Sequence, residues 1–144
     1  MKTKTNKEKL MNLSSLISNI HWIPVIVMTV FSFALGAAWH QKFLFGKTWK
    51  QENHSTLDQK MNIPLIFGGT AVMHFLALAG LSALVSNQGW HNGLHIGLLV
   101  SAVWVLPAMT ATYLFANRSM KLLAIDAGMY VVLFAIAGLV MGIW

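Results

Sequence analysis

The sequence predicts an all-α integral membrane protein: a bundle of four transmembrane helices arranged as two hairpins. Hydrophobic residues make up 56% of its 144 residues and charged residues only 10%, against about 25% charged residues in a typical soluble domain. A soluble domain of this size cannot bury so much apolar surface. The apolar residues also gather into four long runs, and nearly all charges lie between those runs.

The first predicted span covers residues 20–39, and no ionisable residue lies between His21 and His40. About 20 helical residues cross a hydrocarbon core of about 30 Å. Before this span, the basic tail of residues 1–19 has apolar residues at helical spacing, which predicts either an interfacial helix or an extension of the span. A secretory signal peptide is the alternative for the first run, but the run is long for one and three more spans follow.

The other predicted spans cover residues 63–86, 94–115 and 122–144. Pro64 opens the first of these at a position where its missing N–H has no intrahelical acceptor to lose. Apolar residues lie all round the segments, as a lipid-exposed or bundle environment requires. A chain this short has no series of alternating strands that closes a barrel. Residues 20–144 therefore form the predicted four-helix domain.

Ten Lys and Arg residues and four acids give a formal net charge of +6, which in a soluble protein would suggest nucleic-acid binding. Here the charges flank the apolar runs, so we expect membrane lipids and no nucleic acid as partners. Loops 40–62 and 116–121 carry six Lys or Arg against four in the tail. This bias predicts that both loops are cytoplasmic. Because the bias is small, dual topology stays open.

Two stretches of the sequence carry a resemblance to a known family. They comprise residues 33–40 (FALGAAWH) with 45–49 (FGKTW), and residues 113–115 (YLF) with 121–122 (KL) and 125–130 (IDAGMY). They resemble a bacterial membrane family catalogued as domain of unknown function 1761. In that family the first helix ends on a Gly-x-x-Trp-Tyr-like pattern, and His40 stands in the Tyr place. The resemblance implies four transmembrane helices in a bacterial inner membrane and no established activity.

Asp126 is the sharpest functional candidate, because an ionisable residue within a span costs about 3 kcal/mol on insertion scales. It lies about 7 Å beyond Lys121 along the predicted helix. The side chains expected on the same face, as possible partners or neighbours, are Trp39, His40, Lys47, Tyr113, Asn117, Arg118 and Tyr130. Two interpretations stay open: a buried tether that fixes the third loop to the bundle, and a transport or proton-relay group.

His74 lies about ten residues past Pro64, which places it about 15 Å deep, near the centre of the bilayer. A neutral histidine is tolerated there if both ring nitrogens find partners on neighbouring helices. The alternatives to such a packing role are a proton relay, a metal ligand and a haem ligand. His74 and Asp126 differ in height by only about 8 Å, so a water-linked pair is possible.

The sequence predicts no metal site, no cofactor and no catalytic residue. Haem ligation by His74 and His95 has poor geometry, since their rings are expected about 15 Å apart along the membrane normal. His91 and His95 have a ligand-like spacing, but Asn92-Gly93 between them is typical of a turn and no acid or cysteine completes a site. No nucleophile–base pair, phosphate-binding glycine loop or carboxylate pair occurs, so an enzyme is not favoured.

Small residues recur at four-residue spacing, which lets membrane helices approach closely. The pairs and triplets include Ser32/Gly36, Gly93/Gly97/Ser101 and Gly138/Gly142. Their number predicts a homo-oligomer. We therefore expect an oligomeric transport or channel-like protein for a small solute or ion, with Asp126 and His74 as its intramembrane polar site. The alternative is a structural or accessory membrane protein that binds a partner subunit or lipid; a membrane enzyme or redox carrier is the weakest hypothesis.

Overall fold

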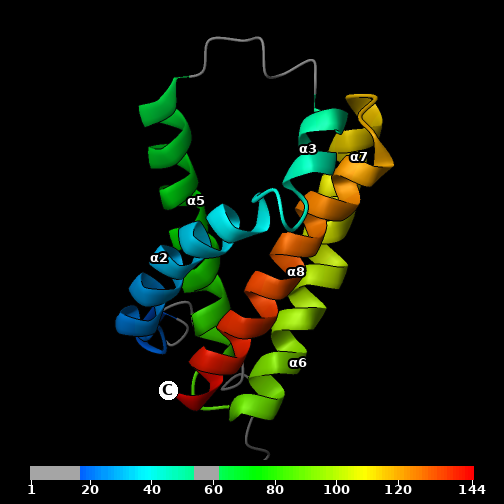
Figure 1. Ribbon diagram of the computed structural model, residues 1–144. Coiled ribbons are helices and arrows are strands. Elements are labelled where there is room, and N and C mark those ends of the chain that lie inside the picture. Colours follow the sequence, from blue (N-terminus) through cyan, green and yellow to red (C-terminus); the bar gives the residue numbers. More distant parts are fainter. Residues whose placement is uncertain (1–16, 54–61) are drawn as a thin grey trace, which may run out of the picture.

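The computed structural model describes residues 17–53 and 62–144, and these form helices joined by short connections (Figure 1). The prediction for the tail, residues 1–19, lies outside the described residues except at its last three positions. The helices, in chain order, are α2 (Trp22–Trp39), α3 (Gly46–Glu52), α5 (Ile63–Val85), α6 (Trp90–Val100), the π-helix η2 (Ser101–Val105), α7 (Leu106–Phe115) and α8 (Met120–Ile143).

Four helical stretches are long and apolar enough to cross a membrane, which confirms the predicted all-α membrane fold. They are α2, α5, the continuous α6–η2–α7 rod and α8. Figure 1 shows α2 crossing α5 obliquely, while α6 and α8 run side by side. In α5, Pro64 lies in the first turn as the sequence predicts, and the Asn62 side chain caps the helix by accepting the Leu65 N–H at 3.2 Å.

Glycines bring α6 and α8 into backbone contact. Gly93 and Gly97 of α6 face Gly138 and Phe134 of α8, and a Cβ at Gly97 would lie 2.9 Å from the Phe134 carbonyl carbon. The Gly89 N–H also donates to the Gly142 carbonyl at 2.9 Å, which ties the start of α6 to the end of α8. The small-residue spacing of these two helices is therefore used inside one chain.

The third span begins at Trp90 rather than near residue 94. Gly89 has φ of +79°, a left-handed conformation that glycine adopts at little cost, and the helix starts immediately after it. The interpretation of Asn92-Gly93 as a turn is wrong, because both residues lie within α6. The rod then widens into η2, where the Leu106 N–H bonds the Ser101 carbonyl, just before Pro107 with its missing N–H.

The buried core follows the contact between α2, α5 and α8. Its fully or almost fully buried side chains include Val25, Leu78, Leu133 and Met141. Many other apolar side chains remain exposed, among them Phe67 at 56% and Trp104 at 62%. Such exposure is expected where hydrocarbon is the solvent, since lipid tails are as apolar as these side chains.

Candidate functional site

The Asp126 carboxylate is the meeting point of four helical segments. Asp126 lies in the second turn of α8, and its side chain is 21% exposed. Its Oδ1 atom accepts a hydrogen bond from Trp49 Nε1 of α3 at 3.0 Å, and its Oδ2 atom accepts one from the Tyr113 hydroxyl of α7. His40, directly after α2, places Nε2 3.5 Å from Oδ1. Charge-assisted bonds of this kind satisfy an acid that would otherwise be costly within a span.

The hydrogen bonding of His40 shows that one of its ring nitrogens, Nδ1, carries a hydrogen. Nδ1 lies 2.8 Å from the Gly36 carbonyl oxygen, which only accepts, so Nδ1 carries a hydrogen. The His40 ring also contacts the Trp49 ring edge-on, with centroids 5.1 Å apart. The end of α2 is thereby attached to both α3 and α8.

Two further contacts hold the same end of the molecule together. Trp39 Nε1 donates to the Ile125 carbonyl oxygen at 2.9 Å, which joins the last residue of α2 to α8. Lys121 Nζ lies 3.7 Å from Glu52 Oε1, which joins the first turn of α8 to the end of α3. The short helix α3 is thus attached to α8 at Trp49 and at Glu52.

Several side chains expected beside Asp126 lie elsewhere. The predicted pairing of Asp126 with Lys47 or Arg118 does not form: Lys47 is exposed on α3, and the Arg118 guanidinium lies 5.7 Å from the centroid of the Tyr113 ring. Asn117 occupies the turn after α7 with φ of +48° and makes no hydrogen bond to the carboxylate. Their long or turn-bound side chains reach water, so they need not pair with the acid.

Sequence reasoning missed Trp49, which donates directly to Asp126. A tryptophan just outside a span is typical of the aromatic belt at the membrane surface, and that interpretation hides a specific role. The available signal was the position of Trp49 in a basic, polar segment that forms a helix of its own. Within residues 17–53 and 62–144, no three His, Cys, Asp or Glu side chains gather as a metal-ligand set.

A second polar cluster lies deeper in the bundle, around His74 of α5. His74 Nδ1 is 2.7 Å from Ser32 Oγ of α2, and His74 Nε2 is 3.4 Å from the Tyr130 hydroxyl of α8. Ser32 Oγ lies 2.6 Å from the Thr29 carbonyl oxygen, and only the serine has a proton for that bond. Nδ1 of His74 therefore donates to Ser32, and Nε2 accepts from Tyr130. Both ring nitrogens have partners on neighbouring helices.

The two clusters lie along one face of α8. Tyr130 follows Asp126 by one helical turn, which is a rise of about 6 Å. The sequence predicts a possible water-linked pair between Asp126 and His74; in the structure Tyr130 stands between them and contacts His74 directly. Tyr130 of the deep cluster therefore lies one helical turn from Asp126 of the surface cluster.

Three hollows lie along α5. The first has a volume of about 840 Å³ and is lined by His40 and Trp49 at one end and by Ser32, His74 and Tyr130 at the other. The second, of about 200 Å³, shares His74 and Tyr130 with the first. His74 and Tyr130 thus form a partition between these two hollows.

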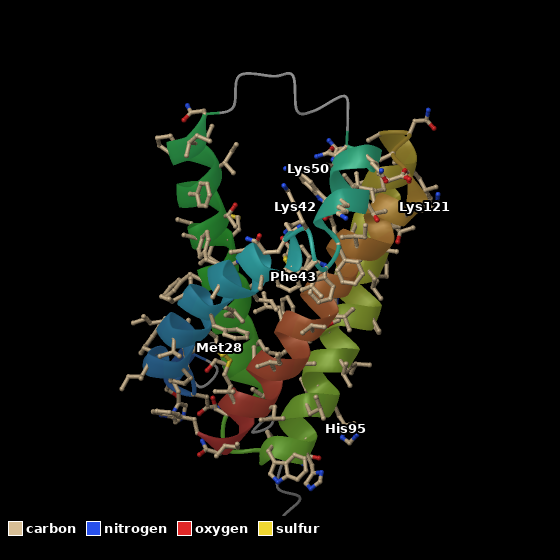
Figure 2. All side chains as sticks on the ribbon, viewed as in Figure 1. Met28, Lys42, Phe43, Lys50, His95 and Lys121 are labelled. Atoms are coloured by element: carbon tan, nitrogen blue, oxygen red, sulfur yellow. The ribbon has the colours of Figure 1, made fainter. Side chains whose placement is uncertain are left out.

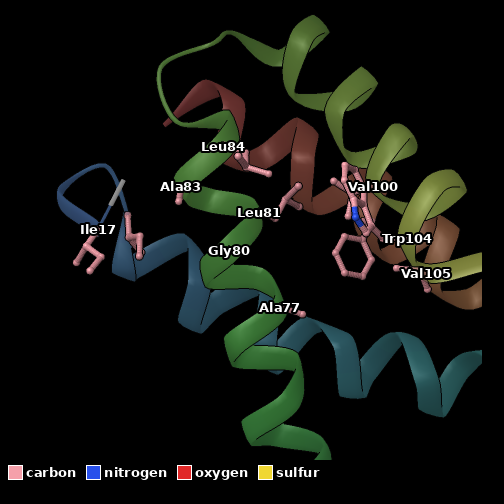
Figure 3. Close-up of a pocket in the computed structure, with 11 residues that line it drawn as sticks. Ile17, Ala77, Gly80, Leu81, Ala83, Leu84, Val100, Trp104 and Val105 are labelled. Atoms are coloured by element: carbon pink, nitrogen blue, oxygen red, sulfur yellow. The ribbon is translucent and has the colours of Figure 1, made fainter. Parts of the chain in front are cut away.

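The third hollow, of about 540 Å³, shares Ala77, Val105 and Phe134 with the second. Figure 3 shows Val100, Trp104 and Val105 on one side of this third hollow, facing Ala77, Leu81 and Leu84 of α5. The π-helix η2 therefore contributes Trp104 and Val105 to the wall. Apart from Trp104, whose indole carries an N–H, the side chains around it are apolar.

The fold and site define a multi-pass membrane protein with two hydrogen-bonded polar clusters inside a four-helix bundle. The family described as a protein of unknown function (DUF1761) matches residues 23–142, and the chain belongs to this family. The match includes every residue of the Asp126 and His74 clusters. No curated protein matches the chain, and no solved structure does.

Proposed function

We propose that the protein moves a small solute or ion across the membrane through the three hollows, with His74 and Tyr130 as the partition that opens. The alignment of the hollows along α5 carries this proposal. Their lining on α5 extends from Ile66 to Leu84, a rise of about 27 Å. That length is close to the thickness of the hydrocarbon core, about 30 Å.

The chemistry of the partition supports this role. One hydrogen bond, of 3.4 Å, joins His74 to Tyr130, and it is the longest bond of the cluster. Breaking it needs only a side-chain rotation of Tyr130, because Ser32 continues to hold His74. Opening the partition between the first and second hollows therefore breaks one weak contact and requires no movement of the helices.

Liposome flux tests the proposal. The full chain is reconstituted into phosphatidylcholine liposomes, and glycerol entry is followed by stopped-flow light scattering, with entrapped pyranine reporting proton entry in parallel. We expect His74→Ala to increase at least one of these fluxes over the wild type, since the variant removes half of the partition. Leu76→Ala, which shortens an exposed side chain on the same helix, serves as the matched control and should resemble the wild type.

A clear negative result is available. If His74→Ala remains folded, by its unfolding temperature and elution volume, and passes neither probe faster than empty liposomes, the three hollows are not a conducting path. The same holds if Leu76→Ala leaks as much as His74→Ala.

The alternative candidate is an accessory membrane protein that binds a partner subunit or lipid. One specific observation favours it: Val30 and Phe67, in the wall of the first hollow, are 66% and 56% exposed. The hollow is therefore open through the side of the bundle, between α2 and α5, toward the lipid. In this alternative Asp126 is a tether and no solute crosses.

The proposed working form is a homo-oligomer. Gly68 and Gly69 of α5 have no side-chain or backbone neighbour within 4 Å of an added Cβ, and the half of α5 that carries them is largely exposed. Such a surface suits helix packing between two chains. Native mass spectrometry from mild detergent tests the state: a dimer or larger is expected, and Gly68→Leu should weaken it. A strictly monomeric wild type contradicts the proposal.

A further inference from the structure

Three exposed lysines lie within two residues of His40 and Trp49, which line one end of the first hollow. Lys42 follows His40 by two residues, and Lys47 and Lys50 flank Trp49 on α3. All three side chains are exposed and form no ion pair with any residue that the structure describes. Figure 2 shows Lys42 and Lys50 at the end of the molecule where α3 lies. His40 and Trp49 line the hollow itself, so these lysines give its rim an excess of positive charge.

The other described cations at this end, Lys121 and Arg118, are already engaged. Lys121 lies 3.7 Å from Glu52, and Arg118 lies over the Tyr113 ring. The two described acids at this end are also engaged: Glu52 pairs with Lys121, and Asp126 is occupied by the donors described above and does not line the hollow. Among the described side chains at this end, the uncompensated charge therefore belongs to Lys42, Lys47 and Lys50.

Between this rim and the His74 cluster, most side chains in the walls of the hollow are apolar. Its walls include Val30, Phe33, Ile66 and Phe67, and the rings of Phe33 and Phe67 stack with centroids 6.1 Å apart. The hollow opens toward the lipid between α2 and α5, as the exposure of Val30 and Phe67 indicates. A hydrocarbon chain can therefore enter from the bilayer without crossing water, and a volume of about 840 Å³ lies within the range of sites that hold small organic molecules.

We propose that the first hollow and its lysine rim form a binding site for one anionic phospholipid of the surrounding bilayer. The phosphate and headgroup contact Lys42, Lys47 and Lys50, while one acyl chain occupies the space between α2 and α5. Basic pockets between membrane helices bind anionic headgroups in this way. A free phosphate gains nothing from the apolar walls, and a zwitterionic lipid gains little from the rim. The site goes beyond the proposed transport, because it requires no flux.

Quenching by brominated lipids tests this site, and the absence of cysteine from the chain makes labelling simple. A bimane label is attached to the cysteine of the Ala34→Cys variant, in the wall of the hollow. The full-length protein is delipidated and kept in an uncharged detergent. The label is titrated with phosphatidylglycerol or phosphatidylcholine brominated in the acyl chain. We expect half-maximal quenching at a concentration of phosphatidylglycerol at least tenfold lower than that of phosphatidylcholine. Val27→Cys, exposed on α2 and absent from the three hollows, is the control and should show no preference.

Lysine variants distinguish the rim from general attraction to the protein. Each replacement of Lys42, Lys47 or Lys50 by Gln should weaken the apparent affinity for phosphatidylglycerol about fivefold, with the phosphatidylcholine curve unchanged. Lys121→Gln should have a much smaller effect. The proposal is overturned if the two lipids quench the label at Ala34→Cys alike. It is also overturned if a variant with Lys42, Lys47 and Lys50 all replaced by Gln still prefers phosphatidylglycerol to phosphatidylcholine. Because this equilibrium involves no flux, its outcome is independent of the liposome experiment.

Discussion

Replacing Gly97 by alanine should separate α6 from α8. An added Cβ would overlap the Phe134 carbonyl and lie 2.9 Å from its carbon and 3.5 Å from Ala135 Cα. These neighbours are backbone atoms of a long helix, so no side-chain rotation relieves the overlap. Separating the helices by the ångström that an ordinary contact needs loosens the whole α6–α8 interface. Overpacking of this kind costs about 1–3 kcal/mol.

The control is Gly68→Ala on α5. A Cβ there meets nothing within 4 Å, and alanine is the better helix former by up to about 1 kcal/mol. The two glycine-to-alanine changes are chemically identical, so their difference reports the helix contact alone. We expect their free energies of unfolding to differ by about 1–3 kcal/mol, which changes the unfolding equilibrium by about fivefold to a hundredfold.

Unfolding by titration with sodium dodecyl sulfate in mixed micelles, followed by circular dichroism, measures this difference. The wild type, Gly97→Ala and Gly68→Ala are compared in one detergent mixture. If Gly97→Ala unfolds at the same detergent fraction as Gly68→Ala, the close approach of α6 and α8 at this position is wrong.

Three further predictions concern the Asp126 cluster and the topology. Asp126→Asn should lower the free energy of unfolding by about 1–3 kcal/mol, because one acceptor oxygen becomes an NH₂ group that faces a donor; unchanged stability in the same titration would refute the cluster. Trp49→Phe keeps the ring but loses the bond to Asp126 and should cost about 1 kcal/mol, whereas Trp90→Phe, at an exposed position, should cost almost nothing. An impermeant maleimide added to intact cells should label Gln88→Cys and not Ala116→Cys if loop 116–121 is cytoplasmic; equal labelling of both would indicate dual topology.

The four apolar helices were predictable because the bilayer fixes both the length and the composition of a span. The exact start of the third span was not. It depends on the left-handed backbone of Gly89, and a glycine four residues before another glycine gives no hint of which one ends the turn. The helix α3 was also missed, since its seven residues include only one large apolar side chain, Trp49, and so cannot reveal a period.

The polar partners were predictable only in part. Helical register correctly brought His40 and Tyr113 toward Asp126. It also suggested Lys47 and Arg118, whose charges make them obvious partners in a sequence. The structure instead gives the acid a tryptophan N–H, because Trp49 is held at the membrane surface by α3 while the lysines of that helix reach water. Charge alone did not identify the donor; the orientation of a short helix decided it.

The way in which the polar groups are satisfied bears on what the first hollow can bind. In the part of the chain that the structure describes, no buried side-chain nitrogen or oxygen atom lacks a hydrogen-bond partner. A polar solute entering the hollow must therefore break bonds such as His74–Tyr130 to gain its own, and the exchange yields little net free energy. An apolar chain breaks none of them, and because it comes from the bilayer, its gain is van der Waals packing against the walls of the hollow. A molecule that is retained in the hollow should accordingly be a chain-bearing amphiphile, whereas a solute that only crosses needs to open the partition briefly and bind weakly.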